Sequence, residues 1–309
     1  MSRLEERAPD DASSKTSRRS LPLALLAEAR PKQWVKNVLV LAAPGAAGII
    51  RERDVVVNTA ITFVCFCLVA SGTYFLNDAN DVEADRRHPT KRFRPIAAGE
   101  IPVGLARVVG VGLLLSGLLL AFLTRWQLGV VIAFYVALST AYTVWLKHIP
   151  VVDVVTIAAF YVIRAIAGGA ATDIELSDWF LILTSFGSLF VVAGKRQAEY
   201  DEMGEDATDT RVTLGEYSGS YLAYLRSVTS GVLLVAYCLW AFEKAELAHH
   251  AVPWFQLSIV WFVLGIFRYA LLIEGGRGGA PEELILSDRM LMLFGAIWAV
   301  TFAAGIYLD

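Results

Sequence analysis

Nine apolar stretches, each close to the length of a membrane-spanning helix, constrain this chain more than any other feature. A bilayer core requires about 20 mainly apolar residues per helix. The first stretch is the shortest, and Lys36 lies inside it. We predict an all-α, polytopic membrane protein, a nine-helix bundle with no room for a second domain. The stretches lie near 34–50, 55–76, 103–124, 127–147, 150–171, 177–195, 218–242, 252–273 and 289–308.

The composition agrees with this fold class. Of the 309 residues, 56% are hydrophobic and 18% are charged, whereas soluble domains average roughly 45–50% apolar and about 25% charged residues. A disordered chain, a collagen and a disulfide scaffold are therefore excluded, and a net charge of −3 gives nucleic acid no electrostatic footprint. Cys65, Cys67 and Cys238 all lie in apolar stretches. Because helix residues two apart point to different sides, we interpret them as inert thiols and not as a metal pair.

Lysine and arginine are distributed very unequally between the two sides of the predicted bundle. With a cytoplasmic N-terminus, 22 of them fall on the cytoplasmic side, Arg164 lies within a span, and 4 fall outside, namely Arg51, Arg53, Arg125 and Lys244. Cytoplasmic loops carry the excess of Lys and Arg. We therefore predict a cytoplasmic N-terminus and an external C-terminus.

The first twenty residues are polar and show no apolar period, which predicts a disordered cytoplasmic tail before a single transmembrane domain over 21–309. Residues 17–20 resemble a twin-arginine signal, but the apolar run that follows is at the lower limit of length for a signal peptide. A short helix over 21–29, lying on the cytoplasmic membrane surface, fits this segment better.

Acidic side chains gather where the second predicted span meets the cytoplasm. Asn77, Asp81 and Asp85 are spaced i, i+4, i+8, so a helix continuing from the span presents them as one stripe, with Asp78 beside it. Mg²⁺ takes oxygen ligands, typically one or two carboxylates together with substrate phosphates. We therefore predict that these four residues hold a Mg²⁺–diphosphate. The alternative is a solvated helix end in which Asp85 and Asp81 pair with Arg86, Arg87 or Lys91.

Basic residues follow this stripe directly. Lys91, Arg92 and Arg94 lie within four residues of one another, and their cations suit charge-assisted hydrogen bonds to phosphates. The alternative is a membrane anchor that touches lipid headgroups.

Two further basic groups lie on the same predicted side. Lys195 and Arg196 leave the end of the sixth span and are candidates for binding phosphate, although Lys195 with Glu199 also forms an i, i+4 salt-bridge pair. Lys32 and Lys36 enter the bilayer beside Trp34, which fits the interfacial aromatic belt. Asn37 follows Lys36 and lies deeper than an anchor requires.

The fifth span holds two charged residues, Asp153 and Arg164. Eleven residues are close to three helical turns, so both are expected on one face. Arg164 lies too far toward the outer side for a cytoplasmic site. We therefore predict a structural helix–helix role for it.

Together these residues resemble the UbiA-type intramembrane prenyltransferase superfamily. The run Asn77-Asp78-x-x-Asp81-x-x-x-Asp85 is similar to its first aspartate-rich motif, and 94–99 is similar to the Arg-Pro…Gly segment after it. The nine-helix plan is also similar, and the resemblance covers about 25–308. It implies a UbiA-like bundle, Mg²⁺ at the first motif, and an active site that faces the cytoplasm from a bacterial plasma membrane.

The superfamily's second aspartate motif, D-x-x-x-D at the end of the sixth span, is replaced here by 194–199, Gly-Lys-Arg-Gln-Ala-Glu. Segments 30–40, 88–99, 163–169 and 187–196 are similar to a branch that transfers 5-phosphoribose from 5-phosphoribose 1-diphosphate (PRPP) to decaprenyl or another polyprenyl phosphate. The resemblance implies that this lipid and PRPP are the substrates and that diphosphate is released. It also implies that the product is the precursor of the arabinose donor for cell-wall arabinan.

The resemblance also suggests roles for the residues. Asp78, Asp81 and Asp85 are the predicted catalytic residues, and with Asn77 the predicted Mg²⁺ ligands. Phosphates of either substrate fall to Lys91, Arg92 and Arg94, which are expected to meet PRPP first, with Lys195 and Arg196 opposite. The lipid phosphate is expected near Lys32, Lys36 and Asn37, and the sequence leaves open which phosphate each cation holds.

Two other functions compete with this one. A conventional prenyltransferase, which moves a prenyl group to an aromatic or polar acceptor, should carry an intact second D-x-x-x-D near 195–205. A secondary transporter should show inverted repeats and broken helices near the midplane, whereas the acids here lie at one surface. The sequence leaves the isoprenoid length, the number of metal ions and any homo-oligomer open.

Overall fold

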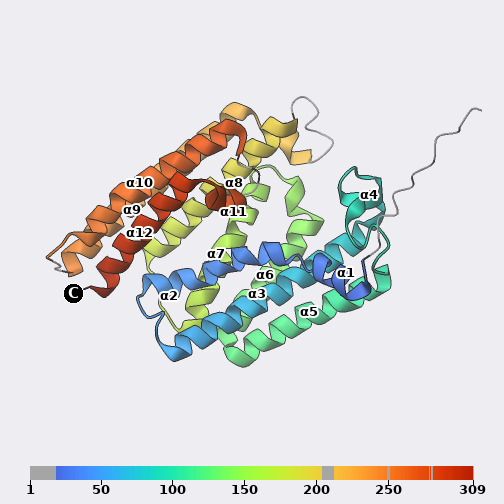
Figure 1. Cartoon of the computed structure of the whole chain (residues 1–309). Helices are drawn as coiled ribbons and strands as arrows, with labels where there is room; N and C mark the ends of the chain where they lie inside the picture. The colour runs from blue at the N-terminus through green and yellow to red at the C-terminus, as the bar shows by residue number, and fades with distance from the viewer. Residues whose placement is uncertain (1–18, 204–211, 249–250, 278, 280, 309) are drawn as a thin grey trace, which may run out of the picture.

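The computed structural model describes residues 19–203, 212–248, 251–277, 279 and 281–308, so most of the predicted polar tail lies outside the described residues. Every regular element in these ranges is helical (Figure 1). The α-helices are α1 (Leu21–Glu28), α2 (Ala42–Ala46), α3 (Arg53–Asn80), α4 (Val82–Arg87), α5 (Val103–Thr124), α6 (Trp126–Val144), α7 (Val152–Thr172), α8 (Asp178–Met203), α9 (Gly219–Ala248), α10 (Trp254–Leu272), α11 (Pro281–Ser287) and α12 (Arg289–Tyr307). Four 3₁₀ helices, η1 (Pro31–Leu41), η2 (Lys91–Phe93), η3 (Leu146–His148) and η5 (Val212–Glu216), and a π-helical turn, η6 (Ile273–Arg277), connect them.

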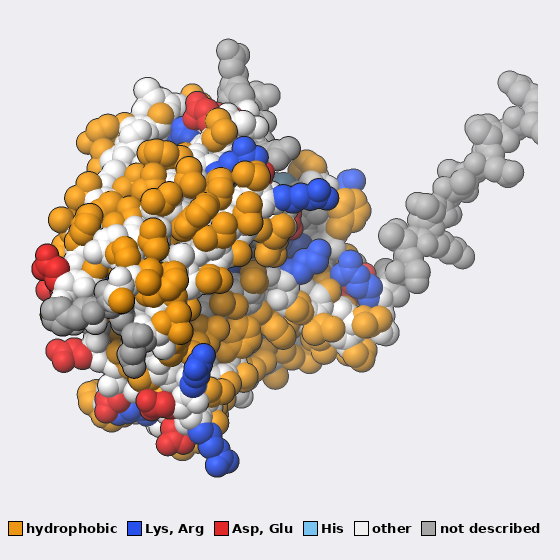
Figure 2. Space-filling model, turned by 60° about the vertical axis from the view of Figure 1, so that its left-hand side comes forward, with side chains coloured by type: hydrophobic (Ala, Val, Ile, Leu, Met, Phe, Trp, Pro, Cys, Tyr) orange, Lys and Arg blue, Asp and Glu red, His pale blue; other side chains and the backbone are white. Residues whose placement is uncertain are grey.

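Eight of these helices, α3, α5, α6, α7, α8, α9, α10 and α12, are long and apolar enough to cross a membrane. They match eight of the nine apolar stretches, and the predicted all-α, polytopic fold class is confirmed. Large apolar side chains are exposed along them, as a lipid-facing surface requires, and they cover most of the left-hand part of the face in Figure 2. Cys65 and Cys67 are buried and form no disulfide in the described part of the chain. Cys65 lies in an apolar core cluster.

The first apolar stretch differs from its prediction as a membrane-spanning α-helix. It is the 3₁₀ helix η1 followed by the short α2. Since a 3₁₀ helix rises about 2.0 Å per residue and an α-helix about 1.5 Å, these two elements together extend about 30 Å, the thickness of the hydrocarbon core. In Figure 1 they run from α1 at one end of the bundle to the start of α3 at the other. In this extended form the short stretch is long enough to cross the hydrocarbon core, although it is not one of the eight spanning helices.

This stretched segment packs against α7 at a glycine. A Cβ atom at Gly168 would lie only 2.0 Å from the carbonyl oxygen of Val40 in η1. Val40 is fully buried in a core cluster with Phe66, Ile132 and other apolar side chains of α3, α6 and α7. The glycine therefore allows direct contact between the two backbones.

We expect Gly168→Ala to lower the stability of the folded protein by an amount at the upper end of the roughly 1–3 kcal/mol that overpacking costs, because the added methyl meets backbone. The thermal midpoint of the detergent-solubilised protein measures this. Gly112→Ala in α5 is the matched control, since a Cβ there has nothing within 4 Å. Equal midpoints for the two variants would contradict this packing.

The alternating helix directions bring the candidate site residues to one end of the bundle. The C-terminal ends of α3 and α8 and the N-terminal end of α7 share this end with α1 and α4, while the C-terminus lies at the opposite end (Figure 1). Which of these ends faces the cytoplasm remains a prediction from the charge distribution.

Candidate active site

The acidic motif is divided by a break in the helix, which corrects the prediction of one continuous stripe. Helix α3 ends at Asn80 and α4 begins at Val82, so that Asp81 lies at the junction with φ −91° and ψ 8°. Asp78 and Asp85 turn inward and are buried, whereas Asp81 is exposed and Asn77 is half-buried. The four predicted ligands therefore divide into a buried pair of carboxylates and two more accessible side chains.

Arg94 joins the two buried carboxylates. Its Nη1 lies 3.1 Å from Oδ1 of Asp78 and 2.8 Å from Oδ2 of Asp85. The Arg94 side chain keeps 31% of its surface exposed, so it approaches the buried acids from the water-facing side. The predicted alternative paired Asp85 and Asp81 with Arg86, Arg87 or Lys91. Asp85 instead pairs with Arg94, and Arg86 pairs with Glu83.

A second guanidinium, that of Arg30, completes this cluster and was missed by the sequence analysis. Its Nη2 donates to Oδ2 of Asp78, and its Cζ lies 4.6 Å from the ring centre of Tyr74. Arg30 has a left-handed backbone with φ 54° between α1 and η1. Strained backbones of this kind persist where the surroundings hold them. The only signal in the sequence was its place at the head of the 30–40 segment.

Glu28 of α1 lies buried beside the same cluster, with 1% of its surface exposed. Neither of its carboxyl oxygens has a hydrogen-bond partner in the described part of the chain. Burial, and then the nearby carboxylate of Asp78, raise the pKa of Glu28 to about 8. The carboxyl is therefore mostly protonated at neutral pH, and the predicted surface helix 21–29 carries a neutral acid on its inner side.

The structure does not bring the other two cations of the 91–94 segment into this cluster. Arg92 is exposed and lies over the ring of Phe93, 4.8 Å from its centre. Lys91 is half-buried in η2, where its backbone N–H donates to Nδ1 of His88. Both side chains remain available at the water-facing edge, so their predicted binding of phosphate stays a prediction.

The second basic pair, Lys195 and Arg196, separates into one accessible and one buried cation. Lys195 keeps 36% of its side chain exposed, and its Nζ lies 4.0 Å from Oε1 of Glu199, which is the i, i+4 pair that the sequence allowed. The side chain of Arg196 is 1% exposed, and Nη1 donates to Oε2 of the same glutamate. Arg196 therefore points into the protein, and its role in phosphate binding stays a prediction.

Asp153 at the start of α7 is the interior partner of Arg196. Its Oδ2 lies 3.3 Å from Nε of Arg196, and its Oδ1 accepts a hydrogen bond of 2.6 Å from the hydroxyl of Tyr217. Thr213 in η5 also donates to Asp153. Burial and the hydrogen bond to Asp153 raise the pKa of Tyr217. The cluster thus joins α7, α8, η5 and the residue that follows η5. No pattern in the sequence pointed to Thr213 or Tyr217.

Arg164, predicted to lie on one face with Asp153, has different partners deeper in the bundle. Its Nε donates to Oδ1 of Asn37 over 2.9 Å, and Nη2 donates to the hydroxyl of Tyr135. The amide of Asn37 also donates to Sγ of Cys67, and Asn37 is 1% exposed. This supports the structural helix–helix role of Arg164. Both ends of the Asn37 amide are used inside the bundle, and its role at the lipid phosphate stays a prediction.

The two N-terminal lysines lie nearer the surface. Lys32 is exposed, and Nζ of Lys36 donates to Oε1 of Gln33 over 2.6 Å. Trp34 donates to Oγ of Ser71 and so fixes the first turn of η1 on α3. Lys36 lines the mouth of a large cavity, which sets it apart from Lys32.

This cavity has a volume of about 1270 Å³. It lies between η1 and α2 on one side and α8, α9, α10 and α12 on the other, and α11 contributes to its wall. Its lining is mainly aromatic and aliphatic and includes Phe190, Tyr269, Trp298 and Phe302. An apolar cavity of this size is suited to a long hydrocarbon chain.

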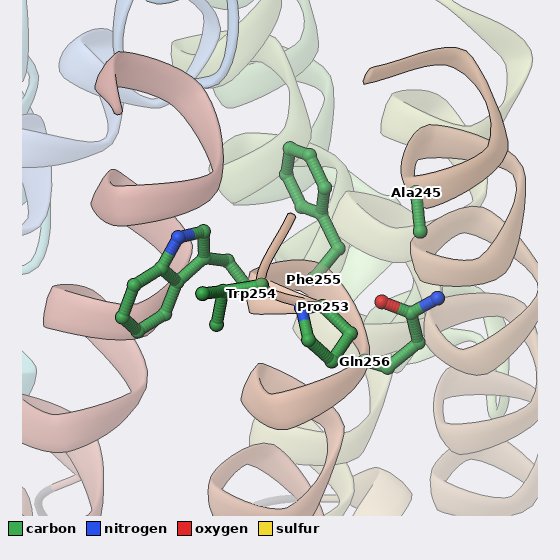
Figure 3. Close-up of a pocket in the computed structure, with 6 residues that line it drawn as sticks. Ala245, Pro253, Trp254, Phe255 and Gln256 are labelled. Atoms are coloured by element: carbon green, nitrogen blue, oxygen red, sulfur yellow. The ribbon is translucent and has the colours of Figure 1, made fainter. Parts of the chain in front are cut away.

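A second cavity, between α9 and α10, is far smaller. It measures about 60 Å³ and is bordered by Ala245 and by the turn Pro253–Gln256 (Figure 3). That is room for about two water molecules, so this cavity does not compete with the large one as a substrate site.

The acidic cluster suits a divalent metal by the chemistry of its donors. Within the described ranges, no three His, Cys, Asp or Glu side chains are close enough to share a metal ion. Asp78 and Asp85 nevertheless supply the hard oxygen donors that Mg²⁺ prefers, and the guanidinium group between them shows that this position accommodates a positive charge. Asp81 and Asn77 lie at the accessible side of the same turn.

Comparison with known proteins identifies relatives over nearly the whole length. Residues 37–294 match the model of the UbiA prenyltransferase family. The chain is 42% identical over 305 residues to decaprenyl-phosphate phosphoribosyltransferase of Corynebacterium glutamicum, covering 97% of this chain and 92% of that protein. It is 44% identical over 281 residues to the enzyme of that name from Mycobacterium tuberculosis, covering 90% and 92%.

Solved structures agree with the fold. A UbiA homologue from Archaeoglobus fulgidus bound to GPP and Mg²⁺ superimposes with a TM-score of 0.67 at 17% sequence identity, covering 91% of this chain and 98% of that one. A digeranylgeranylglyceryl phosphate synthase superimposes with a TM-score of 0.64 at 15% identity, covering 93% and 98%. At these identities the likeness concerns the fold alone.

Proposed function

This chain belongs to the UbiA prenyltransferase family, and from this premise we propose that it transfers 5-phosphoribose from PRPP to a polyprenyl phosphate and releases diphosphate. The observation that carries the proposal is the identity of 42–44%, over 90% or more of the chain, to decaprenyl-phosphate phosphoribosyltransferases. The half-buried Lys195 lies where the prenyl-transferring members carry an aspartate motif, and its positive charge supports a donor with an additional phosphate.

Asn77, Asp78, Asp81 and Asp85 are the residues that would hold Mg²⁺. When bound, the metal supplies charge neutralisation for the diphosphate leaving group. The chain's own contribution is to hold two carboxylates in a buried turn and to keep Asp81 at the accessible edge. This arrangement supports one metal-binding motif, at the water-facing end of α3.

Cations around this turn would bind the phosphates of PRPP. Arg94 contacts both carboxylates, Lys91 and Arg92 precede it on the same loop, and Lys195 extends from the end of α8. Arg196 is a positioning residue in this proposal, because its guanidinium is enclosed by Asp153 and Glu199. Guanidinium and ammonium groups suit phosphate oxygens.

The lipid acceptor would place its phosphate near Lys32 and Lys36 and its chain in the large apolar cavity. Its phosphate oxygen attacks C1 of the ribose, the bond from C1 to the diphosphate oxygen breaks, and charge develops in an oxocarbenium-like state. A phosphate monoester is already anionic, so the attack needs no protein base. Enclosing the donor at the membrane surface protects it from hydrolysis.

The location and the product follow from the same proposal. PRPP is water-soluble and charged, so the site opens to the cytoplasm of a bacterial plasma membrane, as the excess of cations at this end also predicts. The product would be the lipid-linked precursor of the arabinose donor for cell-wall arabinan.

Purified protein incubated with Mg²⁺, PRPP and decaprenyl phosphate should release diphosphate and form a phosphoribosylated lipid. The control replaces PRPP by geranyl diphosphate and the lipid by an aromatic acid. Prenyl transfer in this control, with no use of PRPP, would overturn the proposal in favour of a conventional prenyltransferase.

Filling the cavity with a larger side chain should weaken binding of the lipid acceptor but not binding of PRPP. Gly265 of α10 lines the cavity, and a Cβ there has nothing within 4 Å. We expect Gly265→Phe to raise the KM for decaprenyl phosphate about ten-fold, the loss that follows from roughly 1–3 kcal/mol of excluded apolar contact, while the KM for PRPP stays unchanged. Gly231→Phe, at an exposed and equally open position on α9 outside the cavity, is the control. A rise in both KM values would show that the cavity does not hold the lipid separately.

A further inference from the structure

Both buried carboxylates of the acidic motif are already occupied by arginine. Oδ1 and Oδ2 of Asp78 face different guanidinium groups, those of Arg94 and Arg30, and Asp85 shares the first of them. Asp78 and Asp85 are 6% and 5% exposed in their side chains. Water therefore contributes little to their solvation, and the two arginines neutralise them.

The charges of Asp78, Asp85, Arg30 and Arg94 cancel, and this disfavours the entry of a divalent cation by itself. Two carboxylates and two guanidinium groups sum to zero. A metal ion entering alone would have to displace at least one guanidinium or leave excess positive charge in a poorly hydrated turn, and both are unfavourable. A metal ion entering with a diphosphate brings the negative charge that the displaced guanidinium groups require.

We infer that the guanidinium groups of Arg94 and Arg30 pair with the carboxylates of Asp78 and Asp85 when Mg²⁺ is absent. When Mg²⁺ and PRPP bind together, Mg²⁺ takes the carboxylates and the two guanidinium groups move to the phosphates of PRPP. Arg94 and Arg30 keep 31% and 28% of their side chains exposed, so both guanidinium groups border water and have room to turn. Their donors suit phosphate and carboxylate oxygens equally well. Because each ligand favours the same exchange, Mg²⁺ and the donor bind cooperatively. That the donor is PRPP rests on the proposed function.

Binding of Mn²⁺, followed by electron paramagnetic resonance of the purified protein without lipid acceptor, tests the exchange. The wild-type protein should bind Mn²⁺ weakly alone and at least about ten-fold more tightly with saturating PRPP, at equal free Mn²⁺, which lies within the usual range of coupling between ligands. Arg94→Gln should bind Mn²⁺ alone more tightly than wild type, because the competing cation is gone. In that variant the increase in Mn²⁺ affinity on addition of PRPP should be smaller than in the wild-type protein.

Three further variants sharpen this test. Arg94→Lys keeps the charge but presents a single ammonium to both carboxylates, so an intermediate affinity is expected. Arg30→Gln leaves the bridge from Arg94 to Asp85 intact and should shift Mn²⁺ binding in the same direction as Arg94→Gln. Arg87→Gln is the matched control, because Arg87 is exposed and its Nε donates to the backbone oxygen of Glu83. It should bind Mn²⁺ as wild type does.

The outcomes separate this inference from the proposed function. Unchanged or weaker Mn²⁺ binding by both Arg94→Gln and Arg30→Gln, in monodisperse protein, overturns the exchange. Equal Mn²⁺ affinity of the wild-type protein with and without either diphosphate donor also overturns it. A gain in Mn²⁺ affinity with geranyl diphosphate but not with PRPP supports the exchange and contradicts the proposed donor.

Discussion

Asp81→Asn should lower the rate of phosphoribosyl transfer by about three orders of magnitude, because the loss of a metal ligand removes several kcal/mol of leaving-group stabilisation and each 1.36 kcal/mol is worth a factor of ten. The thermal midpoint should not change. Asp81 is exposed at the break between α3 and α4, and its side chain has no ion pair or hydrogen bond in the described part of the chain. Steady-state diphosphate release and thermal unfolding are the two measurements.

Asp78→Asn should differ from this variant in one respect. Activity should fall as far, but stability should fall too, because the amide removes the charge partner of Arg30 and leaves Arg94 with Asp85 alone in a buried turn. Glu83→Gln is the control for both variants, since Glu83 is an exposed acid whose side-chain partner is Arg86. Asp81→Asn with near-normal Mg²⁺-dependent turnover would remove this residue from the metal site.

The sequence predicted the fold well because apolar length is a property of each segment alone. Eight stretches became helices close to their predicted bounds. The first stretch did not, because the sequence of 34–50 shows how many apolar residues there are but not the rise per residue that their backbone adopts. The 3₁₀ form of η1 depends on tertiary contacts, namely the approach of Val40 to Gly168 and the bond from Arg164 to Asn37.

The candidate site was predicted in part for the same reason. The acidic motif is local, so its position and charge could be read from 77–85. The partners of its acids are not local. Arg94 lies 16 residues from Asp78 and Arg30 lies 48 residues away, and nothing in either segment indicates the other. Glu28 was missed because its burial arises only when α1 packs on α3 and α5.

Lys195 and Arg196 show most clearly where a local pattern fails. They are adjacent and both basic, so the sequence suggests one role for both. A helix, however, turns about 100° per residue, and only the packing against α7 decides which of the two points inward. The partner that settles it, Asp153, lies 43 positions earlier in the chain.

This difference leads to the largest effect on stability that we expect. Arg196→Met should destabilise the protein by about 3–5 kcal/mol, the cost of leaving an uncompensated charge in a buried pair. Asp153 is 0% exposed and would keep only the hydroxyl groups of Thr213 and Tyr217 as partners. The free energy of unfolding in detergent, obtained from denaturant titration, measures the loss.

The double variant Asp153→Asn with Arg196→Met tests the physical reason for this loss. The asparagine still accepts the hydrogen bond from Tyr217, and no buried charge remains between α7 and α8, so most of the stability should return. Lys195→Met is the matched control, because its partly exposed pair with Glu199, with 4.0 Å between the charged atoms, is worth about 0–1 kcal/mol. In that variant stability should hold while the KM for PRPP rises. If Arg196→Met were as stable as Lys195→Met, Arg196 would not be the residue that holds α7, α8 and the Tyr217 segment together.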